Sequence, residues 1–197
     1  MEVKTGTSNS TSLPSNKTLV KAYGKIISMR KFSILVVILI LTSCATTPAF
    51  QTQSTYDRDQ VSWSFEEGTG KIEGDGFLMR RDGMLVKCAG QGVFLIPVSE
   101  YSIERFTFIY GTPNGGYNPA GFGQRLADEP DPAYIEDHRN LYCDVDGKFT
   151  FDNLPAGEYF VQTRVIWQVN DYVNEGGTVS RRVKVEEGKT TKVSLTY

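Results

Sequence analysis

Short runs of apolar and β-branched residues recur along residues 61–197, and each is bounded by Gly, Asp, Asn or Pro. This pattern is typical of an all-β domain. The run at 92–98 is almost entirely apolar and predicts a central strand. Further strands are expected at 71–79, 84–88, 105–110, 148–151, 159–169, 178–185 and 192–197. A helical period is weak and confined to 131–139, so the pattern predicts an antiparallel sandwich of seven to eight strands.

Two turns are indicated by their residues. Asp146-Gly147 lies between two β-rich runs, which favours a tight hairpin at this point. Pro155-Ala156-Gly157 predicts a second turn before the run that starts at Tyr159.

Residues 144–161 read D-V-D-G-K-F-T-F-D-N-L-P-A-G-E-Y-F-V. They resemble the D-x-D-G-x-F-x-F-x-N-L-P-x-G-x-Y-x-V signature of carboxypeptidase regulatory-like domains, and the resemblance extends over 70–110 and 141–197. It implies a Greek-key sandwich like those of transthyretin and Cna B repeats. The residues expected in its core are Phe149, Phe151, Leu154, Tyr159 and Val161. The resemblance says little about function, because this fold serves structural, sugar-binding and carrier proteins alike.

An insertion of about 30 residues, 111–140, departs from that family pattern. Loops of this length in compact domains are usually functional or disordered. The candidate binding residues are its aromatics Tyr117, Phe122 and Tyr134, which could stack on sugars or contact a partner protein. The alternative is that these aromatics fold back on the sandwich.

An export signal is predicted at 29–43. Arg30 and Lys31 precede an apolar run at 32–41, which is shorter than the roughly 20 residues that span a bilayer. Leu-Thr-Ser-Cys at 41–44 resembles the lipobox of bacterial lipoproteins. That resemblance implies cleavage between Ser43 and Cys44, with palmitate-type acyl chains on Cys44. A plain cleaved signal peptide or a short uncleaved anchor is the alternative.

The sequence therefore divides into four segments. Residues 1–28 are a misassigned start or a disordered extension, and 29–43 are the lipoprotein signal peptide. Residues 44–60 are polar and are interpreted as a tether, and 61–197 form the sandwich with its 111–140 insertion. Ala45 follows the cysteine, which in the lipoprotein sorting rule favours the outer membrane, with the domain facing the periplasm or the cell surface.

Charge narrows the choice of partners. Residues 1–43 hold six of the 21 Lys and Arg but one of the 23 Asp and Glu, so residues 44–197 carry a net charge of −7. An acidic domain argues against nucleic acid and against adsorption to anionic phospholipid. Membrane attachment is therefore expected to depend on the lipid at Cys44.

Cys88 and Cys143 remain once Cys44 is lipidated, and an even pair in an oxidising compartment favours a disulfide. Two buried free thiols are the alternative. No metal site and no cofactor are expected, because two cysteines and the single histidine, His138, are too few for a closed zinc site.

No catalytic constellation is found, so no enzymatic activity is expected. The sequence lacks a G-x-S-x-G elbow, and a triad would depend on His138 alone. Asp144 and Asp146 are similar to the first ligands of a calcium-binding loop, but the residues around them lack the EF-hand spacing. The expectation is a lipid-anchored envelope protein that acts as a structural or protein-interaction module. The alternative is a module that binds carbohydrate or an envelope polymer through the insertion, and an assembly factor for a secretion machine is a third option.

Overall fold

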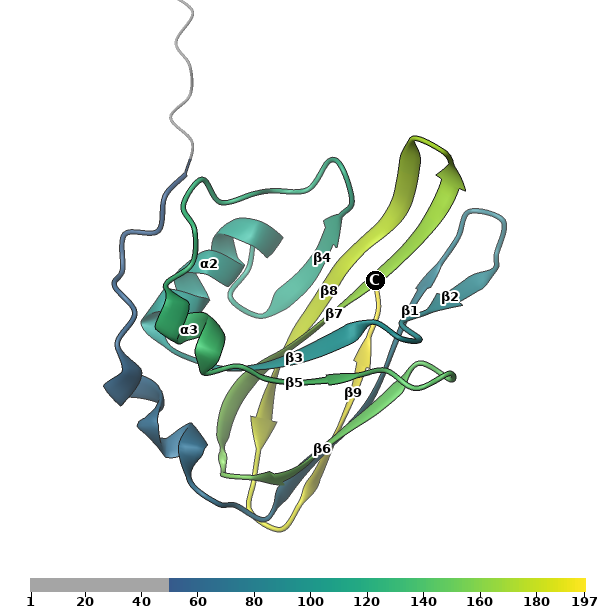
Figure 1. Cartoon of the computed structure of the whole chain (residues 1–197). Helices are drawn as coiled ribbons and strands as arrows, with labels where there is room; N and C mark the ends of the chain where they lie inside the picture. The colour runs from purple at the N-terminus through teal and green to yellow at the C-terminus, as the bar shows by residue number, and fades with distance from the viewer. Residues whose placement is uncertain (1–49) are drawn as a thin grey trace, which may run out of the picture. The chain divides into compact units, whose positions relative to one another are not determined.

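The computed structural model describes residues 50–197, which form a mostly β domain of two facing sheets (Figure 1). The predicted extension 1–28, the signal 29–43 and Cys44 lie outside the described residues. The first sheet contains β1 (Gly70–Met79), β2 (Leu85–Lys87), β6 (Lys148–Leu154) and β9 (Thr190–Leu195). The second has the order β4 (Gly115–Pro119), β8 (Val173–Val185), β7 (Gly157–Asn170), β3 (Gly92–Pro97) and β5 (Arg139–Tyr142).

Strand pairing is antiparallel at every ladder except one. β1 pairs with β6 in antiparallel and with β9 in parallel, and both ladders include Ile72. β6 and β9 therefore lie on opposite edges of β1. The predicted sandwich is confirmed, although it is not purely antiparallel.

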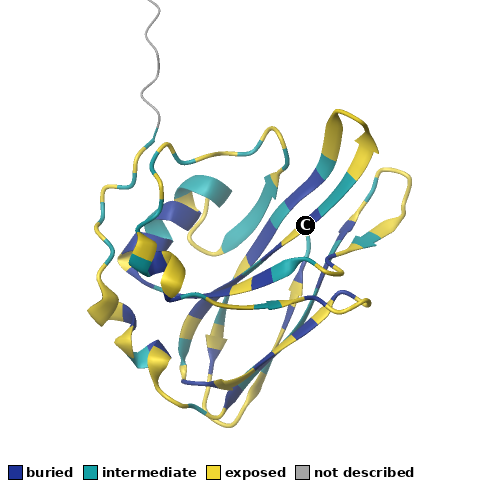
Figure 2. Ribbon diagram, viewed as in Figure 1, coloured by how far each residue is buried: buried dark blue, intermediate teal, exposed yellow. Residues whose placement is uncertain are grey.

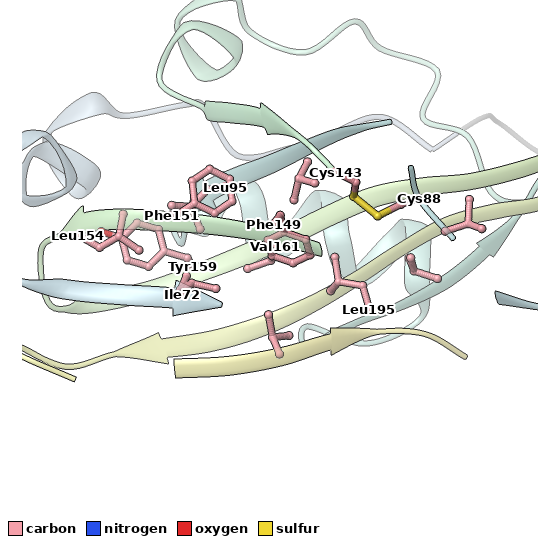
Figure 3. Packing of buried hydrophobic residues seen from close by; sticks show 14 of the residues in the cluster. Ile72, Cys88, Leu95, Cys143, Phe149, Phe151, Leu154, Tyr159, Val161 and Leu195 are labelled. Carbon is pink, nitrogen blue, oxygen red and sulfur yellow. A yellow bond between two sulfur atoms is a disulfide. The ribbon is translucent and has the colours of Figure 1, made fainter. Parts of the chain in front are cut away.

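The core between the sheets contains the residues that the sequence pattern placed there. Phe149, Phe151, Leu154, Tyr159 and Val161 are all buried (Figure 3). The burial of β6 alternates from Lys148 to Asp152, with Phe149 and Phe151 facing inward, and it shifts by one residue at Asn153, so that Leu154 is buried as well. Figure 2 shows that burial is concentrated along the facing strands, whereas the hairpin tips are exposed.

The Asp146-Gly147 turn is present, but it does not join paired strands. Gly147 has φ +74°, and the Asp144 carboxylate accepts hydrogen bonds from the backbone N–H groups of Asp146 and Lys148, both at 2.8 Å. β5 pairs with β3 and β6 pairs with β1, so the chain changes sheets at this turn. The expected hairpin is therefore a crossover between the two sheets.

The strand predicted at 105–110 is wrong, because this segment belongs to helix α2 (Glu100–Tyr110). Ser99 caps its start: the Ser99 hydroxyl accepts from Ser102 N–H, and the Ser102 hydroxyl accepts from Ser99 N–H. Gly111 ends the helix in the left-handed region, at φ +74°. The helix packs Phe106 against Phe160 on the outer face of the second sheet, with ring centroids 3.9 Å apart.

The segment 111–140 is not one continuous loop. It contains β4, which extends the second sheet, and the short helix α3 (Pro132–Glu136), which lies within the weakly helical stretch 131–139. The connection between them is fixed to α2 by Asp128, whose carboxylate accepts from Arg105 at 2.7 Å. The prediction of an insertion without strands is therefore corrected.

Residues 50–65, named here the N-terminal strap, pack on the domain, so the described part of the predicted tether 44–60 is not free of it. The strap ends in the 3-10 helix η1 (Arg58–Phe65), whose Arg58 forms an ion pair with the buried Asp137. Tyr56 donates a hydrogen bond to the same carboxylate at 2.7 Å. Burial opposes the charge of Asp137, but these two donors hold its pKa below the usual value.

The expected disulfide joins Cys88 and Cys143, with Cα atoms 5.8 Å apart (Figure 3). Cys88 follows β2 in the first sheet, and Cys143 follows β5 in the second, so the bond links the two sheets. Both residues are buried in the main core. Among residues 50–197, no helix combines the length and apolar character needed to cross a membrane.

We expect the paired substitution Cys88→Ala and Cys143→Ala to lower the free energy of unfolding by about 4 kcal/mol. The closed loop spans 55 residues, and its closure restricts the unfolded chain. Urea denaturation of the paired variant, compared with the oxidised protein, measures the loss. An unchanged midpoint in urea would contradict the stabilising role.

Candidate functional site

The β1–β2 tip, the end of β4 and the β7–β8 hairpin lie at one end of the sandwich (Figure 1). A cavity of about 290 Å³ is lined by these three segments. We call it the aromatic groove. The β1–β2 tip contributes Met79, Arg80 and Arg81; β4 and the residues after it contribute Tyr117, Pro119, Ala120 and Phe122; the β7–β8 hairpin contributes Trp167, Val173, Asn174, Glu175 and Gly176.

Strand register places Tyr117 and Trp167 on the two strands that flank β8. β4 pairs with β8, which in turn pairs with β7. The Gly176 carbonyl accepts from the Tyr117 hydroxyl and from Ala120 N–H, each at 2.8 Å. Tyr117 also stacks on Tyr197 at 4.8 Å between ring centroids. These contacts hold the Tyr117 ring in one orientation at the wall of the groove.

Two glycines of β8 make room for these rings. A Cβ atom on Gly176 would lie 2.9 Å from Trp167 Cζ3, and Gly176 has φ +93°. A Cβ atom on Gly177 would lie 2.7 Å from Tyr117 Cε2. Since such approaches force neighbouring atoms to shift, the Gly176-Gly177 pair is what allows Tyr117 and Trp167 to pack against β8.

The groove also has a polar component. Trp167 is half-buried, and its indole Nε1 is buried with no acceptor among the residues that the structure describes. Buried polar atoms of this kind are uncommon in folded proteins. Burial raises the pKa of Tyr117, and the nearby Glu175 carboxylate adds to the effect, so the phenol stays protonated as a donor.

Exposed apolar side chains gather at this end of the sandwich. Phe122 is 94% exposed, Tyr172 at the β7–β8 tip is 95% exposed, and Met79 is 65% exposed. Apolar surface that is contiguous and rimmed by polar groups commonly marks a binding site. The groove and its exposed rim therefore form the candidate functional site.

The structure unites two of the three predicted binding residues. Tyr117 and Phe122 both line the aromatic groove. Tyr134 does not: it is 6% exposed and packs edge-on against Tyr56 and Tyr101, with centroids 5.5 and 5.0 Å away. Tyr134 is therefore a core residue under the strap, which corrects its place in the predicted set.

Sequence reasoning missed Trp167 and Tyr172. Both belong to the run I-W-Q-V-N-D-Y-V at 166–173, in which Asp171-Tyr172 forms the β7–β8 turn. The available signal was the Asn170-Asp171 pair, a turn-favouring dipeptide with an aromatic residue on either side of it in the sequence.

A larger cavity, about 360 Å³, lies at the opposite end of the sandwich near η1. Its buried charge is Asp137, which is already engaged by Arg58 and Tyr56. The polar groups there support the attachment of the strap, so the aromatic groove is the better candidate despite its smaller volume. Among the described residues, no three His, Cys, Asp or Glu side chains converge as metal ligands would.

Comparisons with known proteins give two similarities, both to solved structures. No protein-family model matches the chain, and no curated protein matches it. A crystal structure from Pseudomonas aeruginosa, of a protein provisionally described as carbohydrate binding, aligns with a TM-score of 0.60 and 26% identity. The alignment covers 73% of this chain and 99% of that one. A minor pilin from Streptococcus agalactiae aligns at 15% identity with a TM-score of 0.33, over 66% of this chain and 44% of the pilin.

The cluster around Tyr134 contains a histidine whose ionisation is strongly shifted. The ring of His138 contacts Tyr134 edge-on at 4.4 Å, and its Nε2 is buried with no partner among residues 50–197. Burial lowers the pKa of His138 to about 4, although the Asp137 charge opposes this shift. The imidazole is therefore neutral in the folded protein at neutral pH.

We expect the free energy of unfolding to fall by roughly 2–3 kcal/mol between pH 7 and pH 4 on account of His138. In this range the unfolded chain, with an ordinary histidine pKa near 6.5, binds a proton that the folded protein excludes. Above pH 6.5 His138 therefore leaves the free energy of unfolding undiminished, and the loss grows as the pH falls toward 4. Urea denaturation across this range should show a smaller loss for His138→Phe, and equal losses in both proteins would refute the assignment.

Proposed function

We propose that the aromatic groove binds carbohydrate. The observation that carries the proposal is the convergence of Tyr117, Phe122 and Trp167 on one groove with Asn174 and Glu175. Aromatic faces suit the apolar faces of sugar rings, and a few polar groups suit their hydroxyls. The similarity to the Pseudomonas aeruginosa protein supports the same reading, because the shared fold spans nearly all of that protein.

The export features give this binding a location. In this proposal Cys44 carries the lipid anchor, and the domain stands on the outer membrane, facing the periplasm or the cell surface. The cross-sheet disulfide is compatible with an oxidising compartment. Binding without catalysis is proposed, and the sandwich is proposed to be of the carboxypeptidase regulatory-like type, on the strength of the 144–161 signature.

A protein-interaction module is the second candidate. It is favoured by the same exposed rim, since Phe122, Tyr172 and Met79 present apolar surface that a partner protein could cover. In the first candidate the groove itself contacts sugar rings, whereas in the second a partner protein covers the exposed rim.

Glycan-array screening of the full chain, followed by calorimetric titration of the glycans that bind, tests the proposal. We expect Trp167→Ala and Phe122→Ala each to weaken binding by about 2- to 12-fold, the effect of losing one aromatic contact of about 0.5–1.5 kcal/mol. Phe65→Ala is the matched control, because Phe65 is 53% exposed but lines the cavity at the opposite end. An array without binding, or equal affinity in all three variants, would refute carbohydrate binding in this groove.

Intact-mass spectrometry of the membrane-extracted protein tests the proposed anchor. We expect a polypeptide that begins at Cys44 and carries acyl chains, and a Cys44→Ala variant without the added mass. Several acyl chains are needed for durable attachment, since one chain binds only marginally. An unlipidated chain that retains residues 1–43 would contradict the anchor and leave the groove proposal unaffected.

A further inference from the structure

A further cavity, of about 210 Å³, shares the lining residues Pro119 and Ala120 with the aromatic groove. We call it the arginine cavity, because Arg125 and Arg164 line it together with Asn118, Gln124 and Thr178.

The register of three strands builds the floor of the arginine cavity. Arg164 on β7 is directly opposite Thr178 on β8, and Thr178 is directly opposite Asn118 on β4. The neighbouring Val165 and Val179 are buried between the sheets. Because strand side chains alternate, Arg164, Thr178 and Asn118 form a polar row on the outer face of the second sheet.

The loop after β4 folds over this row and brings Arg125 to it. Gly123 N–H donates to the Pro119 carbonyl at 2.8 Å, and Asn118 Nδ2 donates to the Gln124 carbonyl at 3.1 Å. A Cβ atom on Gly123 would lie 2.0 Å from Asn118 Oδ1 and 2.7 Å from the Pro119 carbonyl oxygen, so a larger residue would force this turn to shift. Arg125 follows Gln124 and lines the cavity.

Charge gives the arginine cavity its character. No Asp or Glu lines it, and within residues 50–197 neither Arg125 nor Arg164 has a carboxylate within 4.0 Å. By contrast, Arg105 and Arg182 are paired with Asp128 and Glu158. Two arginines that line one cavity without a carboxylate can receive a carboxylate or sulfate through charge-assisted hydrogen bonds.

The aromatic groove differs in that it contains a carboxylate. Glu175 lines it together with Arg81, and Arg80 there is already paired with Asp82. Glu175 suits sugar hydroxyls, which donate hydrogen bonds, whereas the arginine cavity offers cations with no carboxylate beside them. The neutral and the anionic parts of one ligand would therefore occupy different cavities, on either side of Pro119 and Ala120.

We infer that the ligand is an acidic glycan, whose sugar rings stack in the aromatic groove and whose carboxylate or sulfate binds Arg125 and Arg164. This inference rests on the proposed function and specifies its ligand class. Residues 44–197 carry a net charge of −7, so attraction to such a glycan is local to the arginine cavity and weakens with salt.

The test uses two matched pairs of probes with the full chain: hexagalacturonate and its carboxyl-reduced form, and dextran sulfate and dextran. Calorimetric titration is expected to show at least 10-fold tighter binding of the acidic member of one or both pairs. In the paired variant Arg125→Gln and Arg164→Gln, that preference is expected to disappear while neutral binding is kept. Lysine at both positions is expected to restore part of the preference for the acidic probe. Lysine returns the positive charge but not the planar guanidinium group that pairs with two oxygens at once.

Arg181→Gln is the control, since Arg181 is exposed, lines neither cavity and has no ion pair in the described part of the chain. Thermal unfolding checks that each variant folds. Equal binding of acidic and neutral members, weakened in both by Trp167→Ala, would overturn the acidic-glycan inference and preserve the proposed function. An acidic preference that survives the glutamine variant would overturn the role of the two arginines. No binding of any probe, together with a glycan array without binding, would overturn both proposals.

Discussion

Strand β7 has to bury both of its faces along half its length, and the rest of the domain is arranged around that requirement. Val161 and Val165 point between the sheets, whereas Phe160 points the other way and is covered by Phe106 of α2. A two-sheet sandwich alone would leave Phe160 exposed. That outer face is covered by α2, α3 and the N-terminal strap, which pack around Phe160.

The same strand explains the position of both cavities. β7 and β8 are 14 and 13 residues long, so they extend beyond the part that the helices and the first sheet cover. On the inner face Trp167 lies at the margin of the core and lines the aromatic groove. On the outer face Arg164 lies beyond the cluster around Phe160 and lines the arginine cavity. One strand thus supplies an aromatic residue to one cavity and a cation to the other.

Sequence patterns predicted what depends on local alternation. Phe149, Phe151 and Tyr159 were assigned to the core because period two and the adjacent turns specify them within a few residues. Helix α2 was missed because F-T-F-I-Y at 106–110 alternates as a strand does. The residues that indicate a helix, the caps Ser99 and Gly111, lie outside the predicted strand 105–110. Tyr134 was assigned to a binding surface because the strap that covers it is some 80 residues away in sequence. Trp167 joins Tyr117 only through the ladders of three strands, which no local pattern reports.

The way β1 is held has a mechanical consequence. The chain enters β1 at Gly70 from the strap, and β1 runs toward the aromatic groove between β6 on one edge and the parallel β9 on the other. Once the strap contacts of Arg58 and Tyr56 were broken, a pull between the proposed anchor and a polymer held in the groove would run along β1, across its hydrogen bonds. Those bonds would have to shear together instead of opening one by one. The Cys88–Cys143 link, with β3, α2, β4, α3 and β5 inside its loop, would stop any unravelling that passed β2. If the domain is anchored and loaded as proposed above, tension would therefore be carried by β1 and both of its ladders at once.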